Sequence, residues 1–397
     1  MSKLDELIKK YCPDGVEYKA LDEVIISLNT GLNPRKFFKL NTNDAKNYYI
    51  TIREIHNNKI QITDSTDKIN DDALRLCNNR SNLDKGDILF SGTGTIGEIA
   101  LIEDKPYNWN IKEGVYAIKP IQKMIISKYL MYILQTDTIR TAYMKKVAGG
   151  TVKSIPMKDL KKITIPVPPL PVQEEIVRIL DSFTSLTAEL QAELQAELQA
   201  RKKQYEYYCE LLLSDNIDSP KKKLGDTCLM KSGKAIKASM LSSVLDDKHH
   251  YPCYGGNGIR GYISKVSHHG EFPIIGRQGA LCGNVNYAVG DFYATEHAVV
   301  VKSLGEYTQR YLFYLLKSMK LNQYKSQGAQ PGLAVGNIEN LEASVPDLEK
   351  QNKIVKILDR FDRLCNDLTT GIPAEIAARQ KQYEYYRDKL LTFKELS

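Results

Sequence analysis

The segment QEEIVRILDSF, Gln173–Phe183, occurs a second time as QNKIVKILDRF, Gln351–Phe361, with seven of eleven positions identical. At the same offset of 178 residues, ARKKQYEYY at Ala200–Tyr208 matches ARQKQYEYY at Ala378–Tyr386, with eight of nine positions identical. An unbroken offset means that the two copies have equal length between these blocks. The chain therefore contains an internal repeat, and this repeat determines the fold more than any local motif does.

Upstream of these blocks the repeat continues at lower similarity. The weaker matches are Leu21-Asp-Glu-Val with Leu224-Gly-Asp-Thr, Gly86-Asp-Ile-Leu-Phe with Gly270-Glu-Phe-Pro-Ile, and Tyr129–Leu134 with Tyr311–Leu316, the last pair being expected to form short core helices. The order along the chain is thus variable half, constant half, variable half, constant half. Two similar scaffolds carry two different heads.

The constant segments predict long helices. Proline-containing stretches, Ile165-Pro-Val-Pro-Pro-Leu-Pro and Val345-Pro-Asp, precede them and end the strands before them. The 42 residues from Val172 to Leu213 contain no Gly or Pro and would reach roughly 60 Å. Their apolar residues fall three or four apart on one helix face: Ile176, Leu180, Phe183, Leu186, Leu190, Leu194 and Leu198. In the second copy, Gly371 and Pro373 predict a kink or short break.

A lone helix of this length exposes an apolar stripe and needs a partner. The other copy is the obvious partner, because a pseudo-two-fold axis between like units would lay their helices antiparallel. The alternative is a helix that packs only on its own domain.

The variable segments predict β-rich heads. Strands are expected around a Gly-rich turn in Lys85–Ile102 and in Ile111–Lys119, with counterparts in Phe272–Ile275 and His297–Val301. The expected fold class is α+β, with two β-rich domains in pseudo-two-fold repeat, joined and separated by two long antiparallel helices that form a coiled coil. We expect the first head at 1–168, the first helix at 169–214, the second head at 215–346 and the second helix at 347–397.

The composition favours a soluble, cytoplasmic protein. A formal net charge of +7 over 397 residues is a modest excess that suits a polyanionic partner. The seven cysteines form no Cys-x-x-Cys pair, and Cys253, His268, His269 and Cys282 match no common zinc-site spacing, which favours reduced thiols and no metal. The N-terminus lacks the apolar stretch of a signal peptide, and no run approaches the ~20 apolar residues that span a bilayer.

Two glycine motifs invite a cofactor interpretation. Gly92–Gly97 (GTGTIG) fits the dinucleotide fingerprint, and Phe90–Gly94 (FSGTG) fits a loop of adenosylmethionine-binding methyltransferases. Both motifs need a helix directly after the glycines, because its N-terminus holds the charged groups of the ligand. Here Glu98–Ile102 is expected to be a strand, and Gly276–Gly283, at the matching place of the second half, breaks both patterns. We interpret the motif as a tight turn between two strands.

Other catalytic signatures are also missing from the sequence. The only Pro-Pro pair lies in the linker before the first helix, so there is no Asn-Pro-Pro-Tyr-like motif to hold a flipped adenine. Asp87, Glu103 and Lys105 loosely resemble a nuclease carboxylate set, but the second half has no equivalent. We therefore expect no catalytic residue in this chain.

Over its whole length, the chain resembles the specificity subunit of type I restriction-modification enzymes. The resemblance rests on the head–helix–head–helix order, the repeated ARxKQYEYY block, the segment IPVPPLPVQEEI at 165–176 and the segment GDILFSGTGTIG at 86–97. The tetrapeptides Thr187–Leu190, Gln191–Leu194 and Gln195–Leu198 resemble the spacer repeats of one subgroup. The linker before the second helix, at 345–351, departs from the pattern because it lacks the double proline.

The resemblance implies that each head reads one half of a bipartite, asymmetric site on double-stranded DNA. It implies that the helices act as a ruler and bind two modification subunits, which hold adenosylmethionine and methylate adenine. Restriction subunits would join them to cleave DNA with ATP and magnesium. The chain itself would hold no cofactor. The repeated tyrosines Tyr205, Tyr207, Tyr208, Tyr383, Tyr385 and Tyr386 are the candidates for partner binding.

Candidate DNA contacts are basic and polar residues in turn segments of the heads, because these side chains bind phosphates and base edges. In the first head they are Arg35, Lys36, Thr93, Thr95, Thr151 and Lys153. In the second head they are Lys234, Lys237, Asn257, Arg260, Arg277, Gln278, Gln327 and Gln330.

Two other functions compete with DNA recognition. One is a coiled-coil adaptor whose heads bind proteins, and the other is a self-contained methyltransferase. A DNA shift assay with modification subunits separates the first from DNA recognition, and labelled adenosylmethionine with the chain alone tests the second.

Overall fold

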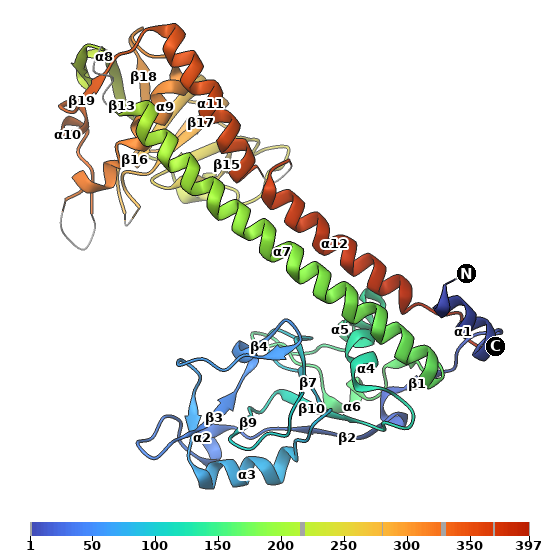
Figure 1. Cartoon of the computed structure of the whole chain (residues 1–397). Helices are drawn as coiled ribbons and strands as arrows, with labels where there is room; N and C mark the ends of the chain where they lie inside the picture. Colours follow the sequence, from blue (N-terminus) through green and yellow to red (C-terminus); the bar gives the residue numbers. More distant parts are fainter. Residues whose placement is uncertain (1, 215–218, 280, 327–330, 368–369, 397) are drawn as a thin grey trace. The chain divides into compact units, whose positions relative to one another are not determined.

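The structure, a computed structural model, describes residues 2–214, 219–279, 281–326, 331–367 and 370–396. It divides into two compact units, Met1–Gln191 with Ala377–Ser397, and Ala192–Ile376 (Figure 1). Each unit therefore holds one head together with parts of both constant segments. The expected boundary at residue 215 lies outside the described residues.

The first head contains a four-stranded sheet, a three-stranded sheet and two separate strand pairs. Its elements are α1 (Lys3–Tyr11), β1 (Tyr18–Ala20), β2 (Ile25–Thr30), α2 (Pro34–Phe37), β3 (Asn47–Ile50), β4 (Ile55–His56), β5 (Lys59–Ile60), β6 (Lys68–Ile69), α3 (Asp71–Ser81), β7 (Ile88–Ser91), β8 (Ile99–Leu101), β9 (Trp109–Ile111), β10 (Val115–Pro120), α4 (Ser127–Leu134), α5 (Asp137–Met144), α6 (Met157–Leu160) and β11 (Thr164–Pro166). The four-stranded sheet has the strand order β2-β10-β7-β8, the three-stranded sheet has the order β6-β3-β9, and the two strand pairs are β1-β11 and β4-β5.

The second head is built on one six-stranded sheet, with the strand order β13-β18-β16-β17-β14-β15. Its elements are β12 (Lys221–Lys223), α8 (Leu224–Thr227), β13 (Cys228–Ser232), β14 (Tyr251–Gly255), β15 (Gly258–Ile263), β16 (His268–Gly276), β17 (Val285–Ala294), β18 (Ala298–Ser303), α9 (Gln309–Ser318), α10 (Val335–Glu339) and β19 (Glu342–Ser344). The expected short core helices are α4 and α9, and most of their residues are buried.

The constant segments form the helices α7 (Leu170–Leu213), α11 (Leu348–Asn366) and α12 (Ile372–Leu390). The first runs unbroken for 44 residues, as expected from the absence of Gly and Pro after Pro171, which lies in its first turn. In the second copy, α11 ends at Asn366 and α12 begins at Ile372, which confirms the predicted break.

A buried glutamine connects the constant helix to its head in the same way in both units. The side-chain oxygen of Gln173 accepts the amide of Ile126, and its nitrogen donates to the carbonyls of Met124 and Pro168 at 2.9 and 2.7 Å. The side chain of Gln351 makes the corresponding three bonds, to the amide of Thr308 and the carbonyls of Glu306 and Pro346, all at 2.8 Å. The repeat seen in the sequence is thus also a repeat of hydrogen bonds.

The strand registers refine the alignment of the two heads. Ser91 pairs with Val115 in the first head, and Gly276 pairs with Ala298 in the second. Ser91 therefore corresponds to Gly276 in the alignment of the two heads, and by the same offset Gly86 corresponds to Glu271. The sequence comparison, which matched Gly86 to Gly270, was wrong by one residue in this segment, because a glycine match in a loop carries no information on strand register.

The helical segments pair antiparallel within each unit. In the first unit, Thr184 and Tyr383 share a hydrogen bond of 2.9 Å between their hydroxyls, and Gln191 donates to Gln380 at 3.0 Å. Residue numbers rise along one helix as they fall along the other, which confirms the antiparallel arrangement. The start of α7 also packs on its own head, since Ile176 and Leu180 belong to that buried core.

Equivalent aromatic residues hold these helix pairs together in both units. The rings of Phe183 and Tyr386 lie 6.5 Å apart in the first unit, and those of Phe361 and Tyr208 lie 5.3 Å apart in the second. The repeat offset relates these residues crosswise, Phe183 to Phe361 and Tyr208 to Tyr386. Each unit thus combines a phenylalanine of one copy with a tyrosine of the other, as a pseudo-two-fold repeat requires.

No helix within the described part of the chain is long and apolar enough to cross a membrane.

Candidate nucleic-acid interface

The glycine-rich segment of the first head joins two antiparallel strands. β7 and β8 pair with each other, with Phe90 opposite Ile99, and residues 92–98 connect them. In the second head, residues 277–284 connect the antiparallel strands β16 and β17 in the same manner. No helix begins after either glycine segment, which confirms the interpretation as a turn between strands and rules out the strand–turn–helix geometry of a dinucleotide site.

Three segments meet at one end of the first head. The amide of Gly92 donates to the carbonyl of Gly114 at 2.8 Å, and the amide of Ile155 donates to the carbonyl of Gly92 at 2.9 Å. The amide of Gly94 donates to the carbonyl of Lys153, also at 2.9 Å. We call the region formed by residues 92–97, 112–114 and 148–154 the loop end of the first head.

The second head has an equivalent loop end. The amide of Arg277 donates to the carbonyl of His297 at 3.0 Å, and the amide of Leu333 donates to the carbonyl of Arg277 at 2.8 Å. The amide of Gly279 donates to the carbonyl of Pro331 at 3.0 Å. Residues 277–279, 281–283, 295–297, 326 and 331–332 form this region, which repeats the hydrogen bonding of the first head.

The loop end of the first head brings together four of its six predicted DNA-contact residues. Thr93 forms a bridge with Ser154, while Thr95, Thr151 and Lys153 are exposed beside it. The other two, Arg35 and Lys36, are exposed on α2. Pro34 of that helix lines a cleft of about 420 Å³ together with Thr93, Lys112 and Glu113, so α2 borders the loop end.

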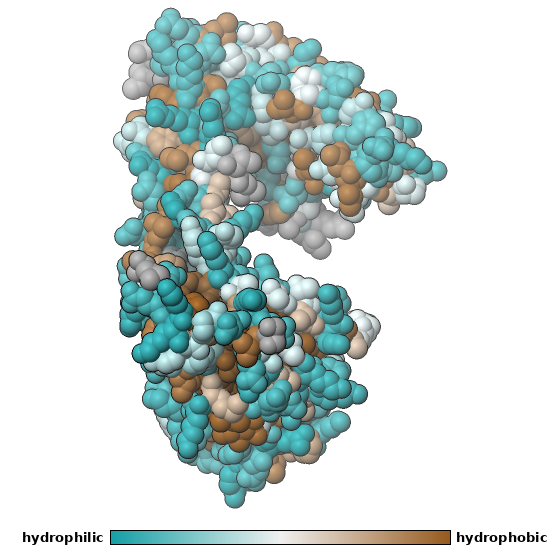
Figure 2. Space-filling view, turned by 90° about the vertical axis from the view of Figure 1, so that its right-hand side faces the viewer, coloured by the Kyte–Doolittle hydropathy of each residue, from teal (hydrophilic) through white to brown (hydrophobic). Residues whose placement is uncertain are grey.

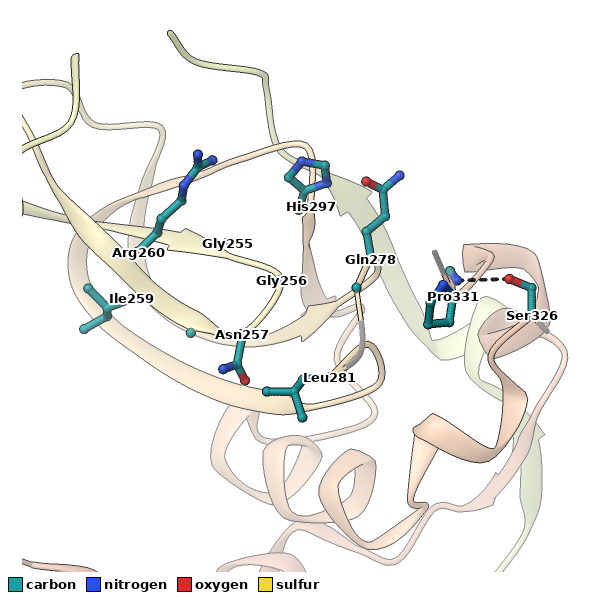
Figure 3. A pocket seen from close by; sticks show the side chains of 13 residues that line it. Gly255, Gly256, Asn257, Ile259, Arg260, Gln278, Leu281, His297, Ser326 and Pro331 are labelled. Carbon is teal, nitrogen blue, oxygen red and sulfur yellow. Dashed lines mark hydrogen bonds between the residues drawn. The ribbon is translucent and has the colours of Figure 1, made fainter. Parts of the chain in front are cut away.

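The loop end of the second head contains a cleft of about 900 Å³. Asn257, Arg260 and Gln278, all predicted from the sequence, line it. In Figure 3, the side chains of Arg260, Gln278 and His297 point to the same side of this cleft. Arg277 stands next to Gln278, and its Nη1 donates to Oγ of Ser232 at 2.9 Å.

The other predicted DNA-contact residues described in the second head, Lys234 and Lys237, do not line the cleft. Lys234 is exposed, and its amide donates to the carbonyl of Ala294 at 3.1 Å, next to the 295–297 segment of the loop end. Lys237 is exposed before the short 3₁₀ helix Ala238–Met240 and does not line the cleft. Gln327 and Gln330 lie outside the described residues.

Sequence reasoning missed several polar residues at the loop ends. His297 lines the cleft of the second head, and Arg53 and Lys112 line the cleft of the first. His297 corresponds to Gly114, since the backbone carbonyl of each accepts the amide that follows the matched strand, β7 or β16. That correspondence depends on strand pairing, so no sequence motif signals it.

The two clefts differ in charge. Arg53 and Lys112 share the first cleft with Asp67 and Glu113, and Arg53 forms an ion pair of 2.6 Å with Asp67. The described residues that line the second cleft include no Asp or Glu, although the carboxylate of Glu296 lies 3.2 Å from Nε2 of the lining residue His297. The lining of the first cleft therefore carries both positive and negative charge, whereas the described lining of the second combines the positive charge of Arg260 with the neutral amides of Asn257 and Gln278.

Asp87, one of the residues that loosely resemble a nuclease carboxylate set, has a structural role. Asp87 is 2% exposed, and both its oxygens accept from Nζ of Lys119 at 2.8 Å. Burial raises the pKa of Asp87, and the bond from Lys119 opposes that effect. In the part of the chain that the structure describes, no group of three or more His, Cys, Asp or Glu side chains could hold a metal ion.

The repeated tyrosines divide into buried and exposed members. Tyr207 is 60% exposed and Tyr385 is 62% exposed. Tyr205 is buried, Tyr383 is half-buried, and burial raises the pKa of both phenols. Tyr208 and Tyr386 pack against the phenylalanines named above. Only one equivalent tyrosine in each repeat, Tyr207 or Tyr385, thus presents most of its ring to solvent.

On the face drawn in Figure 2, hydrophilic residues cover most of the surface and hydrophobic residues form separate patches. Independently of this view, the exposed rings of Tyr207 and Tyr385 are candidate docking points, because tyrosine supplies apolar contact area and tolerates water.

A family model described as the type I restriction modification DNA specificity domain matches residues 13–200 and again 216–378. A curated relative, the type I restriction enzyme EcoprrI specificity subunit of Escherichia coli, is 40% identical over 381 residues, covering 93% of each chain. The EcoR124I/EcoR124II specificity subunit of Escherichia coli is 31% identical over 59% of this chain and 63% of its own length.

A chain from a solved structure, described as the structural basis of complex assembly and conformational transition of a type I restriction-modification system, shares the fold. The TM-score is 0.69 at 18% sequence identity, with 96% of this chain and 98% of that chain covered. The family match covers both halves of the repeat, and catalysis in such systems lies in partner subunits. The chain therefore belongs to the family of type I restriction-modification DNA specificity subunits, which are not themselves enzymes.

Proposed function

We propose that this chain reads a bipartite, asymmetric site on double-stranded DNA, with one half-site for each head. The observation that carries the proposal is the duplicated loop end. Both heads repeat the same backbone hydrogen bonds around the same three segments, yet their side chains differ. The same backbone arrangement with different side chains is consistent with two heads that approach DNA in the same way and read different sequences.

The side chains at the loop ends suit this role. Exposed Thr, Lys, Arg, Asn and Gln residues donate to phosphates and to base edges. In the first head these residues surround a cleft with charges of both signs, and in the second they surround a cleft whose described lining residues include no carboxylate. The two half-sites should therefore differ in sequence.

The helices, in this proposal, set the gap between the half-sites and dock two modification subunits. Tyr207 and Tyr385 support the docking role, because they are equivalent, exposed and far along the constant segments. Two like surfaces on one chain fit two copies of one partner. The chain would direct adenine methylation or ATP-dependent cleavage of DNA in the cytoplasm. Adenosylmethionine would bind the modification subunits, and ATP and magnesium would serve the restriction subunits.

Exchange of the second head tests the proposal. Residues 216–342 are replaced by the corresponding head of another specificity subunit, and the complex with modification subunits is used to map methylated sites. One half of the recognised sequence should change while the other half stays the same. The parent chain, expressed with the same modification subunits, is the control.

Two results would count against the proposal. If both half-sites change, the heads are not independent readers. If neither the parent nor the exchanged complex shifts DNA or methylates a defined site, the chain is instead an adaptor whose heads bind proteins.

A further inference from the structure

Glycine backbone forms much of the wall of the cleft in the second head. The turn between β14 and β15 contributes Gly255, Gly256 and Gly258. A Cβ added to Gly276 would lie 1.8 Å from the carbonyl oxygen of Gly256, and one added to Gly256 would lie 2.7 Å from that of Gln278. The turn and the loop after β16 thus approach so closely that larger residues would separate them. This contact fixes the position of the polar side chains around the cleft.

Among those side chains, Arg260 offers hydrogen-bond donors alone. Arg260, Gln278 and His297 point to the same side (Figure 3). The described residues that line the cleft include no Asp or Glu, and the carboxylate of Glu296 lies 3.2 Å from Nε2 of His297. An arginine guanidinium carries five N–H donors and no acceptor. A group that binds the guanidinium of Arg260 should therefore present acceptors.

The aliphatic part of the Arg260 side chain packs against the backbone, while its guanidinium has no protein partner among the described residues. A Cβ added to Gly255 would lie 3.6 Å from both Cβ and Cδ of Arg260, so the arginine stem lies across the glycine. The head contains three arginines, and two are engaged: Arg277 with Ser232, and Arg310 with Asp359 at 2.7 Å. Arg260 is exposed, and no hydrogen bond or ion pair to its guanidinium is found among the described residues.

Unpartnered polar atoms lie beside the same cleft. Oγ1 of the fully buried Thr295, Oε2 of Glu296, Nδ1 of His297 and Nε of Arg277 are buried without a hydrogen-bond partner among the described residues. Thr295 Oγ1 would lie 3.9 Å from a Cβ on Gly255, directly behind the cleft wall. Such atoms are rare in folded proteins and often mark a site that a ligand or water completes.

We propose that Arg260 reads a guanine in the half-site of the second head, by donating two hydrogen bonds to its O6 and N7 in the major groove. This inference rests on the proposed function. Guanine offers two acceptors side by side on this edge, which match the two parallel N–H groups of the guanidinium. Adenine and cytosine both present an amino donor there, and arginine has no acceptor for it.

The test combines a base analogue with a protein variant. The complex of the full chain with modification subunits is bound to a duplex that carries its mapped site, and each guanine of the second half-site is replaced in turn by 7-deazaguanine. This analogue pairs normally but lacks N7. The wild-type complex should lose roughly 5-fold or more in affinity at one guanine, part of the discrimination that a bidentate arginine provides.

The variant Arg260→Ala should bind the natural site more weakly and should be insensitive to 7-deazaguanine at that position. Arg260→Lys keeps the charge but removes the planar fork, so it should retain non-specific DNA affinity and still lose the discrimination. Lys302→Ala is the matched control, because Lys302 is an exposed cation at the end of β18 that lies away from His297. It should behave as wild type with every duplex.

The proposal is wrong if Arg260→Ala and the wild type respond alike to the analogue at every guanine, or if the second half-site contains no guanine. Failure of the underlying function looks different, because the wild-type complex would then have no preferred site.

Discussion

At the residue scale, one buried glutamine in each half connects the constant helix to its head. Gln173 and Gln351 are both fully buried, and each satisfies one backbone amide and two carbonyls. The groups they bind lie before α4 or α9 and at the proline linker. A single side chain thus orients the head relative to the first turns of its helix.

Replacement of Gln173 by Ala should destabilise the first unit. The change leaves the amide of Ile126 and the carbonyls of Met124 and Pro168 without their partner, at a cost of about 1–3 kcal/mol for each group left unsatisfied. The free energy of unfolding should therefore fall by ~3 kcal/mol or more. Urea denaturation followed by the fluorescence of Trp109, the single tryptophan, measures it in this unit.

Gln191→Ala is the control for this prediction, because Gln191 makes only an exposed bond to Gln380. Its effect should stay within about 0.5 kcal/mol, as is usual for surface positions. Equal effects of the two substitutions would show that the buried bonds of Gln173 do not stabilise the unit.

At the element scale, the middle of α7 is helical because its residues favour helix and not because it is buried. The three tetrapeptides at 187–198 place one leucine in every four residues, and these leucines are only half-buried. Ala, Glu, Leu and Gln all favour helix, so the segment stays helical with few tertiary contacts. A further tetrapeptide would extend the same pattern without disturbing either core.

Insertion of one more Gln-Ala-Glu-Leu after Leu198 should change the gap between the half-sites. Four residues add ~6 Å to a helix, and a base-pair step is ~3.4 Å, so the gap should grow by at most about two base pairs, or about one if the helix is tilted. The added residues rotate the helix by ~40°, close to the ~35° turn of one base-pair step.

Genome-wide mapping of methylated sites measures the effect of this insertion, and deletion of one tetrapeptide is the reciprocal variant. The half-site sequences should stay fixed. An unchanged gap at full activity would mean that the segment is a low-complexity helix with no measuring role.

At the scale of the whole molecule, the repeat provides two equivalent surfaces on one chain. Tyr207 and Tyr385 each form an edge-on pair with the next tyrosine, at 5.6 and 5.3 Å between ring centroids. Equivalent aromatic pairs, each with one mostly exposed ring, should bind two copies of the same subunit with similar affinity.

The double variant Tyr207→Ala and Tyr385→Ala should weaken assembly with the modification subunits and leave the fold intact, because both rings are mostly exposed. The loss should be roughly 10-fold or more per site if each tyrosine is a major contact. Native mass spectrometry gives the stoichiometry, and circular dichroism checks the fold. Tyr107→Ala removes an 84% exposed tyrosine from the first head and should leave two subunits bound. Assembly of the double variant at normal affinity would place the docking surfaces elsewhere.

The sequence alone determined the order of heads and helices, the antiparallel pairing and the break near Gly371. These features depend on local or repeated patterns: helix propensity acts within a few residues, proline and glycine end helices wherever they stand, and a constant offset implies equal structures. The same reasoning correctly assigned Gly92–Gly97 to a turn, because a strand and not a helix follows it.

Only the tertiary structure decided which residues share a site. Thr93 and Ser154 meet, as do Gln278 and Gly332, because strand pairing and loop closure bring together segments more than fifty residues apart. The role of His297 and the one-residue shift in the alignment of the heads follow from strand register, which a single sequence does not encode locally. Likewise, only the structure showed that Tyr207 and Tyr385 are more exposed than the neighbouring tyrosines of the motif. A repeated tyrosine motif does not reveal which ring faces a core and which faces solvent.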